Sequence, residues 1–284
     1  MKYEYNFGGL SNEYTNLQTS KIVILPVPYD GTSTWIKGAD NGPQAILEAS
    51  ANMELFDIET KIEVYKQGIF TAEPLYDFSS PEEMSQKVQR EVSKYLEQNK
   101  FPVVLGGEHS VSIGAIEAIA EKYPDVNILQ LDAHADTREE YEESKYNHAC
   151  VMARARELCS ITQVGIRSMD VEEEIKNNQT IFFAHDICRR NDWQDNVVES
   201  LKQDVYITID LDVFDPSIMP STGTPEPGGL LWYPVLDLLK KVIQTKHVVG
   251  LDVVELCPNN TNKAPDFLVA KLIYALLSYR FNQI

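Results

Sequence analysis

Seven short apolar runs, separated by stretches long enough for helices, restrict the fold more than any other feature of the sequence. They are nearly continuous in apolar residues, which is typical of strands in a parallel sheet that is covered on both faces. The runs are Ile22–Val27, Pro102–Leu105, Val126–Leu131, Ile161–Ile166, Thr180–Phe183, Val205–Leu211 and Val248–Val254. A weaker run lies near Ile62–Tyr65. We therefore predict a central, mostly parallel sheet of about eight strands.

Helical periodicity fills the stretches between these runs. Glu82–Gln98 carries apolar residues at four-residue steps, and Pro81 stands where a helix can begin. The same pattern recurs in Ser110–Lys122, Val235–Gln244 and Ala264–Tyr279. Strands that alternate with helices predict a three-layer α/β/α fold. Because 284 residues with 43% hydrophobic content can form one large core, and no linker interrupts them, we expect residues 1–284 to form a single domain.

Composition narrows the class of protein. The net charge is −18, from 43 acidic and 25 basic residues, and such a field repels nucleic acid and anionic membranes, although it is also typical of an ordinary soluble surface. The first fourteen residues lack the basic leader and apolar core of a signal peptide, and no apolar run is long enough to span a membrane. The four cysteines form no C-x-x-C pair. We therefore expect a cytoplasmic protein that binds neither nucleic acid nor membrane.

Acidic and imidazole side chains follow three of the predicted strands. The motif LGGEHS ends one run, LQLDAHAD ends the next, and ITIDLD ends a third. Ligands bind beyond the carboxyl ends of the strands in open α/β sheets, and alternate residues of an extended chain point to the same side. The sequence therefore predicts that six side chains converge at one edge of the sheet: His109, Asp132, His134, Asp136, Asp210 and Asp212.

Four aspartates in one cleft raise one another's pKa values and destabilise the fold unless cations compensate them. Two divalent ions cancel four carboxylates in formal charge, and oxygen ligands with two imidazoles and no thiolate favour manganese over a structural zinc site. Two such ions about 3.5–4 Å apart can activate a shared water. A single D-x-D or D-x-H pattern usually marks a strand end or a turn, but three of them at successive strand ends favour a metal site. We predict a hydrolase with two manganese ions.

Longer motifs surround these residues. They are YDGTSTWIKGADNGPQAILEAS, GGEHS, DAHAD, DLDVFDPSIMPSTGTPEPGG and GLDVVELCP. Together they resemble the ureohydrolase family of arginases and agmatinases over nearly the whole chain. The resemblance implies an arginase-like fold, two Mn²⁺ ions per chain and a trimer or hexamer. It also implies that metal-activated water attacks a guanidinium carbon, which yields urea and an amine.

The resemblance assigns a role to each residue of the predicted site. The implied metal ligands are His109 with Asp136 for one ion, His134 with Asp212 for the other, and Asp132 with Asp210 as bridges between the two. Asp136 is also implied to be catalytic.

Two further residues match catalytic positions of the family. Glu255 matches the carboxylate that binds the guanidinium, a planar cation that makes paired charge-assisted hydrogen bonds with a carboxylate. His148, in YNHAC, matches the substrate-binding histidine that carries protons toward the leaving amine, and a near-neutral pKa suits that role. Without the resemblance, Glu255 could be a solvated residue after a strand and His148 a residue at a helix start. Asp252 is expected to support the site through a hydrogen bond.

The loop after the first aspartate motif bears on the substrate. Its four glutamates make it a poor receptor for a carboxylate and an attractor for an ammonium group: Glu139, Glu140, Glu142 and Glu143. We therefore predict a small cationic guanidino substrate, agmatine, which is hydrolysed to putrescine and urea in polyamine biosynthesis. Arginine, guanidinobutyrate and metal-dependent hydrolysis of acetylated amines stay open as alternatives. Phe214 and Ser221 depart from the common family pattern near the expected mouth of the site.

Overall fold

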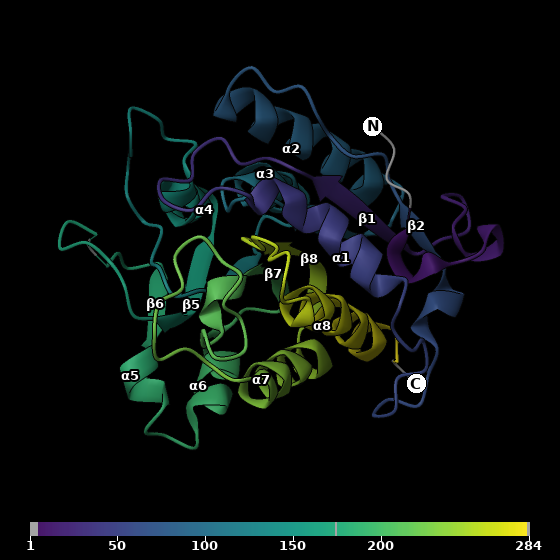
Figure 1. Cartoon of the computed structure of the whole chain (residues 1–284). Helices are drawn as coiled ribbons and strands as arrows, with labels where there is room; N and C mark the ends of the chain where they lie inside the picture. Colours follow the sequence, from purple (N-terminus) through teal and green to yellow (C-terminus); the bar gives the residue numbers. More distant parts are fainter. Residues whose placement is uncertain (1–4, 174, 283–284) are drawn as a thin grey trace.

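An eight-stranded sheet, in which every paired strand is parallel, forms the centre of the computed structural model (Figure 1). The structure describes residues 5–173 and 175–282, so both ends of the predicted 1–284 domain lie outside the described residues. The strand order is β2-β1-β3-β8-β7-β4-β5-β6. The strands are β1 (Ile22–Val27), β2 (Ile69–Thr71), β3 (Phe101–Gly106), β4 (Asn127–Leu131), β5 (Ser160–Ile166), β6 (Gln179–Phe183), β7 (Asp204–Asp210) and β8 (His247–Val254). The prediction of a mostly parallel α/β sheet is confirmed.

Helices connect the strands and cover the sheet. They are α1 (Gly42–Ser50), α2 (Pro81–Glu97), α3 (Val111–Lys122), α4 (Val151–Leu158), α5 (Ala184–Ile187), α6 (Trp193–Ser200), α7 (Trp232–Thr245) and α8 (Ala264–Phe281). The four predicted helices correspond to α2, α3, α7 and α8, and Pro81 begins α2 as expected. Among the described residues, none of the helices combines the length and apolar character that a membrane span requires.

Two hydrophobic cores, one on each face of the sheet, explain the continuous apolar runs. Within β1, Ile22 and Ile24 join the core that α1, α7 and α8 cover, whereas Val23 and Leu25 join the core that α2 and α3 cover. All four side chains are buried. Since each strand must be apolar on both faces, its sequence shows no alternation.

One predicted strand is wrong. The edge strand β2 is Ile69–Thr71, whereas within the expected run Ile62–Tyr65 the first residue forms an isolated bridge with Asp57 and the last two belong to the 3-10 turn before β2. Gly68 ends this turn at φ +77°, and a Cβ there would lie 2.6 Å from the Cα of Ser20. Glycine alone adopts this left-handed backbone without strain and has no Cβ to clash with Ser20. Sheet pairing with β1 begins at the next residue, Ile69.

Candidate metal centre and active site

Four adjacent strands bring the candidate residues to the carboxyl edge of the sheet. Asp210 is the last residue of β7, Asp132 directly follows β4, Glu255 directly follows β8, and His109 lies three residues beyond β3. The order β3-β8-β7-β4 makes these strands neighbours, although the chain separates them widely. The sheet therefore assembles the site from distant segments, as the strand-end motifs predict.

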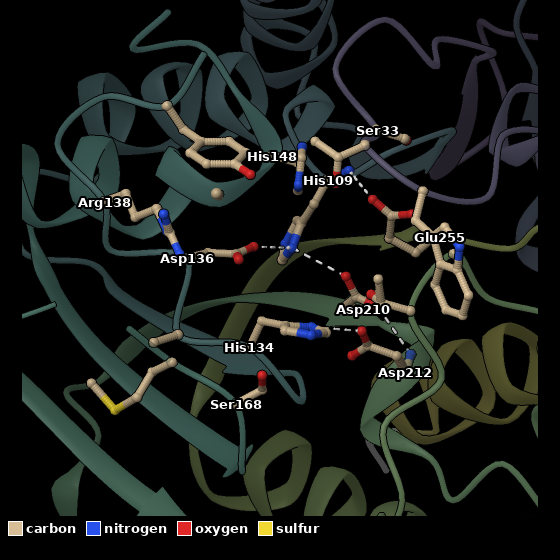
Figure 2. Close-up of a pocket in the computed structure, with 18 of the residues that line it drawn as sticks. Ser33, His109, His134, Asp136, Arg138, His148, Ser168, Asp210, Asp212 and Glu255 are labelled. Carbon is tan, nitrogen blue, oxygen red and sulfur yellow. Dashed lines mark hydrogen bonds and ion pairs between the residues drawn. The ribbon is translucent and has the colours of Figure 1, made fainter. Parts of the chain in front are cut away.

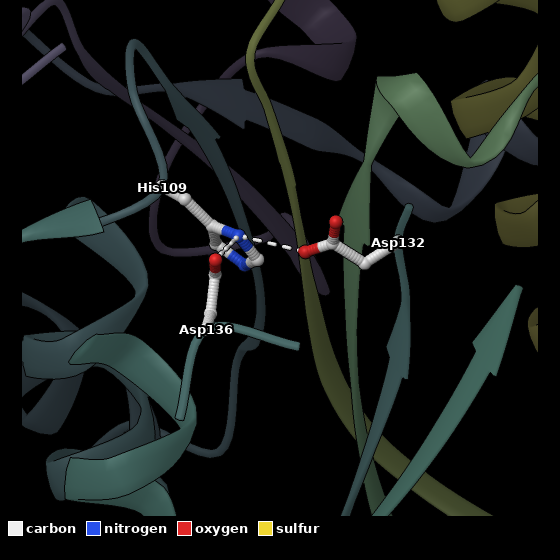
Figure 3. A group of neighbouring side chains, drawn as sticks. All are labelled: His109, Asp132 and Asp136. Atoms are coloured by element: carbon white, nitrogen blue, oxygen red, sulfur yellow. Dashed lines mark ion pairs between the residues drawn. The ribbon is translucent and has the colours of Figure 1, made fainter. Parts of the chain in front are cut away.

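The first cluster surrounds His109. Its Nδ1 atom lies 3.2 Å from Oδ2 of Asp132, 3.0 Å from Oδ2 of Asp136 and 3.3 Å from Oδ2 of Asp210 (Figures 2 and 3). All four side chains are buried. The ligand atoms of His109, Asp132 and Asp136 lie within 4.8 Å of one another, close enough to hold one metal ion.

The second cluster surrounds His134. Its Nδ1 atom lies 2.8 Å from Oδ2 of Asp212 and 3.7 Å from Oδ1 of Asp132. These three residues form a second group whose ligand atoms lie within 4.8 Å of one another. Asp132 thus belongs to both groups, with one carboxylate oxygen toward each histidine.

Turns, and not the two-residue period of a strand, bring the DAHAD and DLD residues together. The strand β4 ends before Asp132, and Asp136 has left-handed backbone at φ +52°. Oδ1 of Asp132 accepts a hydrogen bond from the backbone N–H of His134 at 2.6 Å. In the second motif, Oδ1 of Asp210 accepts from the N–H of Asp212 at 2.9 Å and caps a 3-10 turn. The expectation of convergence is confirmed, but its geometric reason is corrected.

The donors and acceptors around His109 show whether a cation fits the first cluster. Its Nε2 atom lies 3.0 Å from Oγ1 of Thr208, whose hydroxyl donates to Oδ1 of Asp252 at 2.6 Å. Thr208 has one hydrogen, so Nε2 of His109 must be the donor, and in the neutral ring that a metal ligand requires Nδ1 is the bare nitrogen. Its Nδ1 lone pair then faces three carboxylates, and this buried atom makes no hydrogen bond. A divalent cation satisfies all four groups, and Asp252 has the supporting position expected of it.

Electrostatics within the cluster support the same conclusion. Burial and the charge of Asp132 raise the pKa of Asp136 to about 7. Burial and the charges of Asp212 and Asp132 raise the pKa of Asp210 well above its usual range. These carboxylates are therefore costly to ionise side by side, and cations would remove that cost. The donor set of oxygens and imidazoles, without a thiolate, suits Mn²⁺.

Three buried glutamines form a chain that ends on the shared carboxylate. Nε2 of Gln179 donates to Gln163 Oε1 at 2.6 Å, Nε2 of Gln163 donates to Gln130 Oε1 at 2.5 Å, and Nε2 of Gln130 donates to Asp132 Oδ2 at 2.6 Å. Nε2 of Gln163 also donates to the carbonyl of Ala135 at 2.7 Å, which fixes the direction of its amide. Every amide dipole in this chain points its positive end toward Asp132.

Glu255 lies at the rim of the two clusters. Its backbone is left-handed, with φ +68°, and its Oε1 atom accepts from the backbone N–H of His109 at 2.8 Å. The side chain lines the same pocket as His109 and His134 (Figure 2). One carboxylate oxygen is thus anchored by the protein, and the other, Oε2, is the one left for a ligand in the pocket.

His148 lies on another side of the pocket, at the start of a 3-10 turn before α4. Its Nδ1 atom lies 3.1 Å from Oγ1 of Thr32. In the metal-free protein, burial and the positive charges of protonated His109 and His134 lower its pKa to about 4. The ring is therefore neutral at pH 7.

The acidic loop does not have the position expected of it. Among the described residues that line the pocket, Tyr141 is the only member of 139–143. Glu139 instead pairs with Arg154 at 3.1 Å and with Arg156 at 2.6 Å. None of the glutamates of this loop lines the pocket, so the loop is not placed as a direct receptor of a substrate ammonium.

Other segments, to which the sequence assigned no role, complete the pocket wall. Asp170 and Glu173 add two further acidic groups to it, and Arg138 lies 3.3 Å from Asp170. Trp35, which is 70% exposed, belongs to the wall contributed by the loop after β1. The segment YDGTSTWIKGADNG contains this residue, so its motif carried a signal for the pocket without specifying a role.

The two departures from the common family pattern lie outside this wall. Phe214 is buried, and it forms a bridge with Leu230. Ser221 is also buried, and its carbonyl accepts from the N–H of Cys257 at 2.8 Å. Neither residue lines the pocket itself, although Asp212 and Gly223, each two residues away from one of them, do.

Comparison with known proteins agrees with this geometry. The arginase family model matches residues 20–278. An N(1)-aminopropylagmatine ureohydrolase of Synechocystis sp. is 36% identical over 281 residues, which cover 95% of this chain and 92% of the relative. An agmatinase of Pyrococcus horikoshii is 30% identical, with 97% of both chains covered. The crystal structure of agmatine ureohydrolase of Thermoplasma volcanium has a TM-score of 0.89 at 30% identity and covers 98% of this chain and 96% of that chain. The chain belongs to the arginase family and is a ureohydrolase.

Proposed function

We propose that this protein hydrolyses the guanidinium group of agmatine, or of a longer amine built on it, to urea and the free amine. One observation carries the proposal. Asp132 is shared by two His/Asp clusters, and Glu255 stands beside them in the same pocket. This arrangement provides two cation sites next to an anionic receptor for a planar cation.

The proposed ligands are those that the sequence indicates. They are His109 and Asp136 for one ion, His134 and Asp212 for the second, and Asp132 and Asp210 for both. When bound, two Mn²⁺ ions lower the pKa of water and make it nucleophilic near pH 7. The donor atoms agree with this choice of metal, and we propose Mn²⁺ as the native ion.

The remaining residues bind the substrate and move its protons. Glu255 accepts hydrogen bonds from the guanidinium through Oε2, because Oε1 is already bound to the N–H of His109. His148, a neutral imidazole, accepts a proton from the attacking water and delivers it to the leaving amine. Asp136 orients the attacking water as well as holding an ion.

The two candidate substrates, agmatine and its N1-aminopropyl derivative, differ only at the end remote from the guanidinium. The carboxylates of Asp170 and Glu173 line the same pocket and are not used by the proposed chemistry, which favours an amine over a carboxylate as the remote group. Relatives named N(1)-aminopropylagmatine ureohydrolase are 32–40% identical to this chain, and those named agmatinase are 30–32% identical. This favours the aminopropyl derivative as the second candidate. Arg138, in the same wall, is the group that a carboxylate-bearing guanidine would use.

Urea release is expected from agmatine and N1-aminopropylagmatine when the protein is reconstituted with Mn²⁺. Arginine and 4-guanidinobutyrate should react at least about 100-fold more slowly in kcat/KM, because their carboxylate meets Asp170 and Glu173, and a like-charge contact costs several kcal/mol. The ratio of the two amine substrates decides between the candidates. Faster turnover of a carboxylate-bearing guanidine would contradict the proposed substrate class and assign its binding to Arg138.

Gln130→Met is expected to weaken Mn²⁺ binding about tenfold, in the range typical of residues that support metal ligands. Methionine fills the same space but cannot donate a hydrogen bond to Asp132. The carboxylate of Asp132 would then no longer be held in its orientation toward both clusters. Titration followed by the paramagnetic resonance of free Mn²⁺ measures the affinity. Gln179→Met, at the far end of the same chain, is the matched control because it leaves the bond from Gln130 to Asp132 in place. Equal affinity of the Gln130 variant and the wild type would refute the role of the glutamine chain.

A further inference from the structure

Glu108 is a buried carboxylate that the proposed chemistry does not use. Its Oε1 atom accepts from Oγ of Ser110 at 2.5 Å. Its Oε2 atom accepts from the backbone N–H of Ser110 at 3.1 Å and from Oγ1 of Thr32 at 2.9 Å. Three donors converge on this side chain, so both of its oxygens act as hydrogen-bond acceptors in the protein interior.

Thr32 connects this carboxylate to the pocket. Its Oγ1 atom accepts from the backbone N–H of His148 at 3.1 Å and lies 3.1 Å from Nδ1 of the same residue. The side chain is buried, with 8% of its surface exposed. It joins the loop after β1 to the turn before α4, and these two segments are 116 residues apart in sequence.

Hydrogen counting determines the direction of this connection. The hydroxyl of Thr32 has one hydrogen, which it donates to Glu108, so both of its remaining contacts must be acceptances. The backbone N–H of His148 is one donor, and Nδ1–H of the ring must be the other. A neutral imidazole protonated at Nδ1 has its lone pair on Nε2, the atom left for the pocket that His148 lines.

We propose that Thr32 is a positioning residue, which holds His148 in the tautomer with a bare Nε2 by linking its Nδ1–H to Glu108. The inference rests on the proposed role of His148 as proton carrier. It assigns a specific task to the YDGTST segment and to the glutamate of GGEHS. His109 has the same type of support, in which Thr208 links its ring to Asp252.

Substitution of Thr32 tests this link in the Mn²⁺-loaded enzyme. Thr32→Val keeps the shape but removes the hydroxyl, so kcat should fall about 100-fold, in the range of general acid–base contributions, while KM stays within about threefold. Thr32→Ser restores the hydroxyl and should recover kcat to within about threefold of the wild type. Thr162→Val is the matched control, because it removes a buried threonine hydroxyl on β5 that contacts Asn127 and does not line the pocket.

A measurement without turnover separates this inference from the proposed function. Long-range ¹H–¹⁵N spectra of the full chain, metal-free and labelled at its five histidines, report the tautomer of each ring. His148 is assigned by its loss in His148→Asn, and it should show a protonated Nδ1 in the wild type and in Thr32→Ser but not in Thr32→Val. If no guanidine is hydrolysed, this result still supports the link while the proposed function fails.

Three outcomes overturn the link. They are unchanged kcat in Thr32→Val, equal kcat losses in the valine and serine variants, and a wild-type His148 protonated at Nε2.

A folding defect in Thr32→Val is detected by its melting curve. Glu108→Gln then takes its place, because an amide whose oxygen faces Thr32 preserves the tautomer, so retention of most of kcat supports the inference. A His148 ring protonated at Nε2 in this variant overturns it.

Discussion

Asp132→Asn is expected to abolish measurable urea release and to weaken Mn²⁺ binding by a factor on the order of 10³. Asp132 is fully buried and belongs to both His/Asp clusters, so one substitution removes a charged ligand from each of them. Loss of one partner from a buried charge pair costs about 3–5 kcal/mol, and about 1.4 kcal/mol corresponds to a tenfold change in affinity. Asparagine keeps the size of the side chain, and therefore the effect reports charge and donor atoms and not a cavity.

Metal content and thermal stability must be measured together for this variant. In the metal-free protein Asp132→Asn should melt no lower than about 5 °C below the wild type, since the fold of a domain this large depends on many contacts. Asp266→Asn is the matched control, because Asp266 is also buried but lies beside Lys263 at the start of α8. Full Mn²⁺ binding by Asp132→Asn would show that the two clusters are not metal sites.

The sheet and the metal-ligand candidates are the parts that the sequence predicts well. Strands buried on both faces are continuous apolar runs, and the rule that sites lie at strand carboxyl ends is enough to place His109 and Asp210 on one edge of the sheet. Local backbone is predicted less well. Asp136 reaches the cluster through a left-handed residue, which no two-residue period indicates.

The residues of the pocket wall are predicted poorly by sequence patterns. Glu139 and its neighbours suggest an acidic receptor by composition alone, but the direction of a loop side chain depends on tertiary partners such as Arg154. Asp170 lies four residues beyond the end of β5, and no periodicity connects it to the site. Thr32 lies within a family motif, yet its task depends on a contact across 116 residues of sequence. Residues that act through such contacts can be assigned only once the fold is known.

Glu255→Gln is the second substitution for which we expect a large effect, and its pattern should be the reverse of that for Asp132→Asn. Mn²⁺ binding should be nearly unchanged, whereas kcat/KM for the guanidino substrate should fall about 10²- to 10³-fold. Removal of one partner from a buried, hydrogen-bonded charge pair costs about 2–5 kcal/mol, which corresponds to a loss of this size. Glutamine can still accept from the N–H of His109, so the anchor of the side chain is retained and only its charge is lost.

Stability provides an independent check on this assignment. Burial and the nearby charge of Glu108 raise the pKa of Glu255 well above its usual range, so its ionised form is costly in the folded protein. A carboxyl group whose pKa is raised by folding contributes stability below its unfolded pKa and loses it as pH rises through the folded pKa. Neutral glutamine avoids this loss, so the metal-free Glu255→Gln protein should melt above the wild type at pH 7 and equally with it near pH 4. Removal of a charge that binds substrate but destabilises the fold is expected to slow turnover and to raise the melting temperature. A lower melting temperature at pH 7 would instead identify Glu255 as a structural residue, and the receptor for the guanidinium would have to be sought elsewhere in the pocket.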